Sequence, residues 1–174
     1  MADIFDKAKQ FTDAREAIQL GIYPYFRALS DTEGATATFE GKEVVMLGSN
    51  NYLGLTTDQR VRDAATEAIQ RYGTSVTGSR FLNGTLELHL ELERRLAKFV
   101  GMEAALVFST GYQTNLGTIS ALLSKNDYAI LDKDVHACNV DGVMMSRGEM
   151  KRFKHNDMTD LERVLSRLPQ EAGK

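Results

Sequence analysis

The sequence lacks most of the features that would place it outside ordinary globular proteins. Its 174 residues include one cysteine, Cys138, two prolines, and no repeat or low-complexity tract. A single cysteine excludes an internal disulfide and fits a reducing cytoplasm. No apolar run approaches membrane-spanning length, and residues 1–9 are too polar for a signal peptide. We therefore expect a globular cytoplasmic protein without a transmembrane segment.

Several chemical motifs are also missing, and their absence narrows the function. The formal net charge is −3, and no block of basic residues is interleaved with aromatic ones. Nucleic acid is therefore not an expected partner. The sequence has no metal-ligand spacing, no Walker loop and no Gly-x-Gly-x-x-Gly motif, so we expect neither a metal site nor a nucleotide site of those kinds.

The pattern of apolar residues predicts an α/β fold behind an N-terminal arm. Residues 3–20 predict an amphipathic helix, and residues 36–39 and 43–47 predict a β-hairpin. Strands that then alternate with helices predict a layered α/β fold, in which ligands gather beyond the C-terminal ends of strands. The expected helices are 58–72, 85–100 with Thr85 as N-cap, 112–123, 136–146 and one that starts after Asn156 or Asp157; the expected strands are 104–108, 127–131 and 151–154.

The stretch around Gly111 predicts a place for an anion. Residues 104–108 read as a buried strand, Ser109 to Gly111 as a turn, and Tyr112 as the start of a helix. Free backbone N–H groups and the helix dipole at such a start favour an anion, most often a phosphate. The alternative is an ordinary strand-to-helix connection that binds nothing.

His136 follows the strand predicted at 127–131, where it can face the Gly111 turn. Its imidazole could lie on an aromatic ligand or donate to a carboxylate, or it could be a surface loop histidine. Cys138 has no evident partner base, so we expect a small packed residue rather than a nucleophile. His89, on the apolar stripe of its helix, is expected to be a packed core histidine.

Two adjacent asparagines precede this α/β region. Asn50 and Asn51 could bind a carboxylate through their amide donors, or they could simply shape a turn, which is the commoner role of paired asparagines.

Four motifs, in this order and spacing, resemble those of the α-oxoamine synthases. They are residues 48–55, residues 77–85 with His89 and Leu92-Glu93, residues 108–115, and His136-Ala137 with Asp141-Gly142. That family uses pyridoxal phosphate and belongs to the aspartate-aminotransferase fold. The resemblance extends over nearly the whole chain from about residue 20. Residues 78–85 and 155–158 look most like the bacterial serine palmitoyltransferase branch of the family.

The resemblance implies a fold and a division into domains. Residues 1–55 would form an N-terminal helical arm, the β-hairpin and a substrate loop. Residues 56–174 would form the N-terminal portion of the large, pyridoxal-phosphate-binding domain of a fold type I enzyme, with three αβα layers and a mixed, mostly parallel sheet.

The resemblance also implies roles for individual residues. The backbone N–H groups of Gly111 and Tyr112 would hold the phosphate of pyridoxal 5'-phosphate, and His136 would stack on its ring and orient the substrate carboxylate. Asn50 and Ser79 would lie near the amino-acid and acyl-CoA substrates, reaching across the interface of a homodimer. The implied reaction joins an amino acid to an acyl-CoA and releases CoA and carbon dioxide.

The sequence departs from the family pattern beside His136 and in length. Val135 replaces a residue that is usually polar, and Cys138 and Asn139 replace a serine and an apolar residue. No lysine here matches the family's Schiff-base lysine, so we expect an N-terminal piece of a longer enzyme that is inactive alone. The alternatives are a 2-amino-3-ketobutyrate CoA ligase or 8-amino-7-oxononanoate synthase, a non-catalytic subunit without the lysine, and an unrelated α/β nucleotide-binding module.

Overall fold

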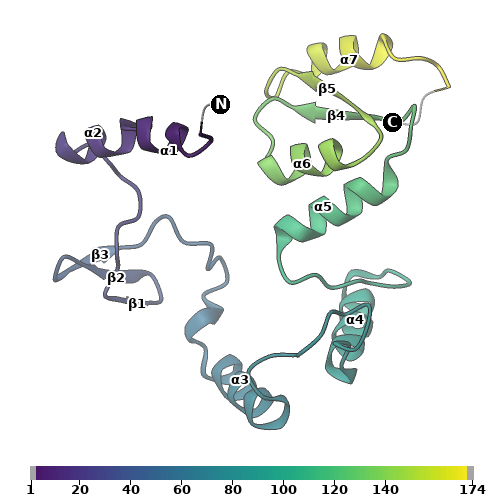
Figure 1. Ribbon diagram of the computed structural model, residues 1–174. Coiled ribbons are helices and arrows are strands. Elements are labelled where there is room, and N and C mark those ends of the chain that lie inside the picture. Colours follow the sequence, from purple (N-terminus) through teal and green to yellow (C-terminus); the bar gives the residue numbers. More distant parts are fainter. Residues whose placement is uncertain (1–2, 172–174) are drawn as a thin grey trace. The chain divides into compact units, whose positions relative to one another are not determined.

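The computed structural model describes residues 3–171 and divides into two compact units (Figure 1). The first unit extends to Val76, and the second begins at Thr77. Each unit has its own secondary structure and is described by itself. Among the described residues, no helix combines the length and the apolar character needed to cross a membrane.

The N-terminal arm contains two short helices instead of the single helix predicted over residues 3–20. Helix α1 (Asp6–Gln10) ends at Phe11, whose backbone is extended, and α2 (Asp13–Gln19) begins two residues later. Asp13 and Glu16 place negative charge in the first turn of α2, next to its positive dipole end, which favours a helix that begins there. Gly21, with a φ of 69°, follows the end of α2 as predicted.

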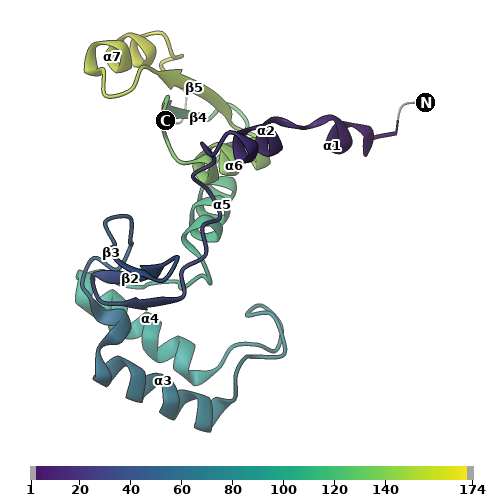
Figure 2. The same cartoon turned by 90° about the vertical axis from the view of Figure 1, so that its left-hand side faces the viewer.

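A three-stranded antiparallel sheet follows the arm (Figure 2). It consists of β1 (Asp31–Glu33), β2 (Thr36–Phe39) and β3 (Lys42–Val45). The predicted hairpin of β2 and β3 is confirmed, with Phe39 paired to Lys42 across a two-residue turn. Both turn residues, Glu40 and Gly41, have positive φ, as a tight hairpin turn requires. Strand β1 was not predicted, because its three residues carry no apolar alternation.

The first unit ends in a 3₁₀ turn, η1 (Leu55–Thr57), and helix α3 (Gln59–Tyr72). The Asp58 carboxylate accepts the backbone N–H of Arg60 at 2.9 Å and caps the helix. Gly73, with a φ of 81°, ends it. Both ends agree with the sequence prediction.

The second unit is the α/β part of the chain. It contains α4 (Glu87–Val100), α5 (Gly111–Leu122), β4 (Tyr128–Asp132), α6 (Ala137–Met145), β5 (Glu149–Phe153) and α7 (Met158–Ser166). Strands β4 and β5 pair in parallel, with Tyr128 opposite Glu149 and Asp132 opposite Phe153. Helix α6 connects them, and α6 and α7 lie on opposite sides of the two strands (Figure 1). The predicted α/β class is therefore confirmed.

Two local predictions in the second unit are wrong. Residues 104–108 are not a strand, because a strand needs a neighbour in a ladder and no described segment pairs with them. Thr85 is not the N-cap of α4; that position is Leu86, whose backbone N–H donates to Nδ1 of His89 at 2.9 Å. His89 is thus a half-buried capping residue rather than a core histidine.

The tightest packing in the second unit lies between α5 and α6. Cys138 and Val143 on α6 are each 2% exposed. Gly142 permits the close approach, because a Cβ atom there would lie 2.9 Å from Cβ of Ile119 on α5. This contact packs the middle of α6 against α5, and the Asn115 amide, which donates to Sγ of Cys138 at 3.1 Å, links the two helices nearer their beginnings.

Candidate cofactor site

Helix α5 begins with backbone donors that are free to bind an anion. Thr110 caps the helix, because its Oγ1 accepts the N–H of Gln113 at 3.1 Å. The N–H groups of Gly111 and Tyr112 donate to no acceptor within residues 3–171. A Cβ atom built on Gly111 would meet no atom within 4 Å, so no side chain crowds this residue. Free donors at the positive end of a helix dipole form a site for phosphate.

His136 lies beside this helix start. It is the N-cap of α6, and its Nδ1 accepts the backbone N–H of Cys138 at 3.1 Å. The rings of Tyr112 and His136 meet edge to face, with centroids 6.4 Å apart and planes at 76°. The structure therefore brings together three residues singled out from the sequence, Gly111, Tyr112 and His136.

Side chains from α5 and α6 surround His136 and were not singled out for this role. The Tyr112 hydroxyl donates to the Asp141 carboxylate, and this hydrogen bond raises the pKa of Tyr112. The Asn115 amide donates to Sγ of Cys138 at 3.1 Å, and Sγ lies 2.8 Å from Nδ1 of His136. The spacing of Asn115 three residues after Tyr112 on one helix could have indicated that it faces the same way.

A second cluster, the Asp132 clasp, holds the loop that leads from β4 to His136. Its members are the Asp132 carboxylate, the His155 imidazole and the backbone N–H groups of Asp134 and Asn156. The two N–H groups donate to Asp132 at 2.8 and 3.0 Å, and Nδ1 of His155 lies 2.9 Å from it. The Asn156 and Asp134 N–H groups, followed by His155, lower the pKa of Asp132 to about 2. Asp132 in turn raises the pKa of His155.

Ser79 lies on a tightly curled loop, residues 77–85. The N–H of Gly84 donates to the carbonyl of Ser79 at 2.8 Å, and a Cβ atom on Gly84 would lie 1.8 Å from the carbonyl oxygen of Gly78. Only glycine fits there. The Ser79 side chain is exposed, and among the described residues no hydrogen bond connects it to His136.

One carboxylate ties the Ser79 loop to the segment that precedes the phosphate-binding turn. Oε1 of Glu93 accepts from the Arg80 guanidinium and from the N–H of Val107, both at 3.0 Å. The Val107 N–H, and to a smaller extent Arg80, lower the pKa of Glu93. Residues 104–108 are therefore held by a side chain of α4 rather than by a strand partner.

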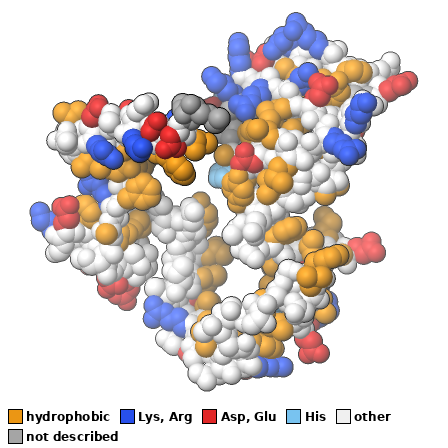
Figure 3. All heavy atoms as spheres, viewed as in Figure 1, with side chains coloured by type: hydrophobic (Ala, Val, Ile, Leu, Met, Phe, Trp, Pro, Cys, Tyr) orange, Lys and Arg blue, Asp and Glu red, His pale blue; other side chains and the backbone are white. Residues whose placement is uncertain are grey.

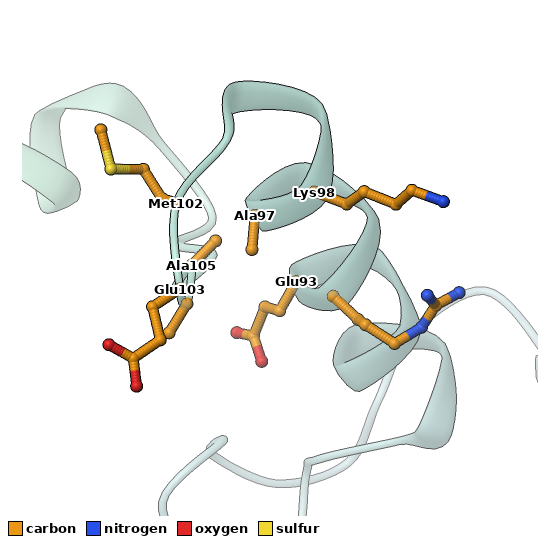
Figure 4. A pocket seen from close by; sticks show the side chains of 8 residues that line it. Glu93, Ala97, Lys98, Met102, Glu103 and Ala105 are labelled. Atoms are coloured by element: carbon orange, nitrogen blue, oxygen red, sulfur yellow. The ribbon is translucent and has the colours of Figure 1, made fainter.

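A groove of about 420 Å³ lies between α4 and residues 102–105 (Figure 4). Glu93 and Ala97 of α4 lie opposite Ala105, and Lys98 and Glu103 lie at its edges. Its lining includes neither Gly111, Tyr112 nor His136, so it is distinct from the candidate cofactor site.

Asn50 belongs to the first unit. Its Oδ1 accepts the Tyr52 hydroxyl at 3.3 Å, and its side chain is exposed. Asn51 instead shapes the loop, because its amide nitrogen donates to Thr56 Oγ1 at 2.8 Å and its backbone N–H donates to Ser49 Oγ at 3.0 Å. The two asparagines therefore differ: Asn51 has a structural role, whereas the Asn50 amide nitrogen donates to no acceptor within residues 3–171.

Within residues 3–171, no group of three or more His, Cys, Asp or Glu side chains is arranged to hold a metal ion.

Comparison with known proteins gives a family and two sets of relatives. Residues 42–174 match the family model of aminotransferase class I and II. The chain is 47% identical over 169 residues to the serine palmitoyltransferase of Sphingobacterium spiritivorum, an alignment that covers 97% of this chain and 42% of that protein. It is 48% identical over 146 residues to the 8-amino-7-oxononanoate synthase of Geobacter sulfurreducens, covering 84% of this chain and 37% of that protein.

A solved structure agrees with these relatives. The structure is that of a lysine-to-alanine variant of serine palmitoyltransferase from Sphingomonas paucimobilis with a bound PLP–myriocin aldimine. It superimposes on this chain with a TM-score of 0.91 at 38% sequence identity, and the match covers 98% of this chain and 44% of that chain. The chain thus spans about two fifths of the length of the relatives it matches. Because the family model covers well over half of the sequence, the chain belongs to the aminotransferase class I and II family.

Proposed function

We propose that the protein carrying this chain is a pyridoxal-phosphate-dependent acyltransferase of the serine palmitoyltransferase kind. It condenses an amino acid with an acyl-CoA and releases CoA and carbon dioxide. The names of the matched relatives support this proposal, as does the bound PLP of the S. paucimobilis structure. The proposal concerns the intact protein, since this chain corresponds to 42% of the Sphingobacterium relative.

One observation carries the proposal: free helix-start donors lie beside an imidazole. The N–H groups of Gly111 and Tyr112 suit a phosphate, and His136, in edge contact with Tyr112, supplies a flat ring beside it. Pyridoxal phosphate has an anionic phosphate joined to an aromatic ring, so these residues fit both of its parts. When bound, this cofactor supplies an electron sink for the α-carbon of an amino acid.

The residues of this chain then bind and orient. Gly111 and Tyr112 fix the phosphate through two backbone donors, while Asp141 holds the Tyr112 ring through its hydroxyl. His136 packs on the cofactor ring and donates a hydrogen bond to the substrate carboxylate. We assign substrate contacts to Ser79 and Asn50, whose polar side chains are both exposed. The Schiff-base lysine and the aspartate that pairs with the pyridine nitrogen come from outside this chain.

A homodimer is part of the proposal. Large apolar side chains of the N-terminal arm are exposed, including Phe5 at 69%, Leu20 at 72% and Phe26 at 94%. Figure 3 shows such side chains at the surface. Apolar patches of this kind mark interaction surfaces. Light scattering on the intact protein should give a dimer, and removal of residues 1–26 should weaken it; a monomer at micromolar concentration would contradict this part of the proposal.

The relatives also support a second candidate, an 8-amino-7-oxononanoate synthase. Identity to the Geobacter protein is 48%, against 47% to the Sphingobacterium protein, so identity does not separate the two activities. They differ in substrates, and a panel of glycine, alanine and serine against short and long acyl-CoAs separates them. We expect turnover with serine and a long acyl chain; preference for another amino acid of the panel with a short acyl chain would favour the second candidate.

A visible spectrum of the intact protein with added pyridoxal phosphate tests catalysis against a non-catalytic subunit. An enzyme should develop an absorption band that borohydride fixes covalently onto a lysine. The cofactor should then appear by mass spectrometry on a peptide outside residues 1–174. Absence of any such lysine would leave a non-catalytic subunit that keeps the fold.

A further inference from the structure

The imidazole of His136 is held through one nitrogen by donors that come from Cys138. Nδ1 accepts the backbone N–H of Cys138 at 3.1 Å, and Sγ of the same residue lies 2.8 Å from Nδ1. A backbone N–H can only donate. Nδ1 must therefore present its lone pair, and in a neutral imidazole the proton then sits on Nε2.

Asn115 sets the direction of the second contact. Its side-chain amide, assigned with the nitrogen toward α6, donates to Sγ of Cys138 at 3.1 Å. The sulfur therefore acts as an acceptor from Asn115, and its S–H proton is free to point at His136. The Asn115 amide thus donates to the sulfur, and the thiol and the backbone N–H of Cys138 share the single lone pair of Nδ1.

Burial keeps these contacts away from competing partners. Cys138 is 2% exposed and Asn115 is half-buried, so water cannot readily replace either side chain. His136 itself is exposed, which leaves its Nε2 edge accessible. The buried edge of the ring is thus fixed by protein donors, and the open edge is left for a ligand.

We propose that Cys138, oriented by Asn115, is a positioning residue that fixes His136 as the Nε2–H tautomer and turns that N–H toward the ligand. In this tautomer His136 can donate to an anionic group such as a carboxylate. It cannot accept a proton at Nε2 while it is neutral. The use of this donor in catalysis rests on the proposed function, whereas the tautomer itself does not.

Nitrogen NMR of the intact, ¹⁵N-histidine-labelled protein, without substrate at neutral pH, tests the proposal. The sequence has three histidines, and loss of one signal set in His136→Asn identifies His136. We expect a pyridine-type Nδ1 and a pyrrole-type Nε2. His89 serves as an internal reference, because its Nδ1 also accepts a backbone N–H, that of Leu86. A pyrrole-type Nδ1, or the mixed signals of a free imidazole, would overturn the proposal.

Two substitutions separate positioning from packing. Cys138→Ser keeps a hydroxyl that can accept from Asn115 and donate to Nδ1, so the single-tautomer pattern should remain. Cys138→Ala removes the thiol but keeps the backbone N–H, so Nδ1 of His136 should lose one of its two donors, and its signal should move toward that of Nδ1 of His89, which a backbone N–H alone holds. If Cys138→Ala keeps the wild-type pattern, the side chain has no such role. The wild-type spectrum decides the tautomer even if Cys138→Ala does not fold, and it does so whether or not the protein proves to be an acyltransferase.

Discussion

Two polar clusters of opposite character hold the two ends of the loop between β4 and α6. At its beginning, the Asp132 clasp joins a carboxylate to His155, and their side chains are 27% and 64% exposed. At its end, Nδ1 of His136 contacts Cys138, which accepts in turn from the Asn115 amide, and Cys138 is 2% exposed. Exposed charges respond to pH and salt, whereas buried neutral donors do so much less. We therefore expect the two ends of the loop to differ in how strongly they respond to pH and salt.

The largest effect should come from His136→Ala in the intact protein. We expect kcat/KM to fall by about ten- to hundredfold, since a hydrogen bond to a charged group contributes about 1.5–3 kcal/mol. The substitution also removes the α6 cap, which costs about 1 kcal/mol of unfolding free energy. His136→Asn is the matched control, because asparagine caps well but has no imidazole. His136→Asn should have the stability of the wild type but the low activity of His136→Ala. Unchanged turnover in either variant would contradict the role assigned to His136.

Asp132→Ala should have the next largest effect, and on stability first. It leaves His155 and the N–H groups of Asp134 and Asn156 without their shared acceptor. We expect a lower urea midpoint than for His155→Ala, which removes only one of these donors. Turnover should fall several-fold, because the loop that carries His136 loosens. Equal midpoints for the two variants would show that the two backbone bonds contribute nothing.

The pH dependence of stability distinguishes the two clusters. The pKa of Asp132 is lowered to about 2 in the folded protein. Asp132 therefore stabilises the fold fully above its unfolded pKa, and this stabilisation is lost as the pH falls toward the folded pKa of about 2. The pKa of His155 is raised in the folded protein. His155 therefore stabilises the fold fully below its unfolded pKa, and this stabilisation is lost as the pH rises through the folded pKa. With unfolded pKa values of about 3.9 and about 6.5, the clasp should contribute most between about pH 4 and 6.5.

Urea midpoints of the wild type and His155→Gln across this range measure the effect. Glutamine can still donate to Asp132 but carries no charge. The difference in urea midpoint between the two proteins should be largest between about pH 4 and 6.5 and should decrease at higher pH. The difference between wild type and Cys138→Ser should stay constant with pH. If the difference in urea midpoint between wild type and His155→Gln does not change with pH, the contact between Asp132 and His155 does not depend on charge.

Salt should produce the smallest effect. Raising the ionic strength from about 0.01 to about 1 M shortens the Debye length from about 30 to about 3 Å, which screens exposed charges. The stability difference between wild type and His155→Gln should therefore decrease. The difference for Cys138→Ala should not change. A salt-sensitive Cys138→Ala would mean that the neutral cluster depends on charge after all.

The sequence was sufficient to predict the helix ends and the hairpin turn, because these depend on residues that are close together in the chain. Asp58 and Gly73 bound α3, Glu40-Gly41 closes the hairpin, and Asp157 caps α7, all as predicted. Residues 104–108 were predicted wrongly as a buried strand: no described segment pairs with them, and Leu106 is 68% exposed, so an apolar run alone does not supply the partner that a strand needs.

The candidate site was predictable only in outline. Gly111, Tyr112 and His136 were found because turn chemistry and strand ends follow from the order of residues. The Asp132–His155 contact and the Cys138–Asn115 contact were not found, because each joins residues 23 positions apart and depends on how two elements pack. Such contacts leave no local pattern.

The central claim, that Gly111 and Tyr112 hold the phosphate of pyridoxal phosphate, is tested most directly by Gly111→Pro. Proline suits the first position of a helix, and the extended backbone of Thr110, with φ −144° and ψ 154°, suits the residue before it. The substitution therefore removes one N–H donor and places the ring Cδ where its hydrogen pointed, with little change to the backbone. Gly111→Ala, which keeps that donor, is the control.

Affinities for pyridoxal phosphate and for pyridoxal, measured on the intact wild type and both variants, give the answer. Gly111→Pro should weaken binding of pyridoxal phosphate by about tenfold or more, the loss expected for one hydrogen bond to a charged group. Binding of pyridoxal, which has no phosphate, should stay unchanged, as should both affinities in Gly111→Ala. Unchanged pyridoxal phosphate binding in Gly111→Pro, or an equal loss for both ligands, would contradict the account.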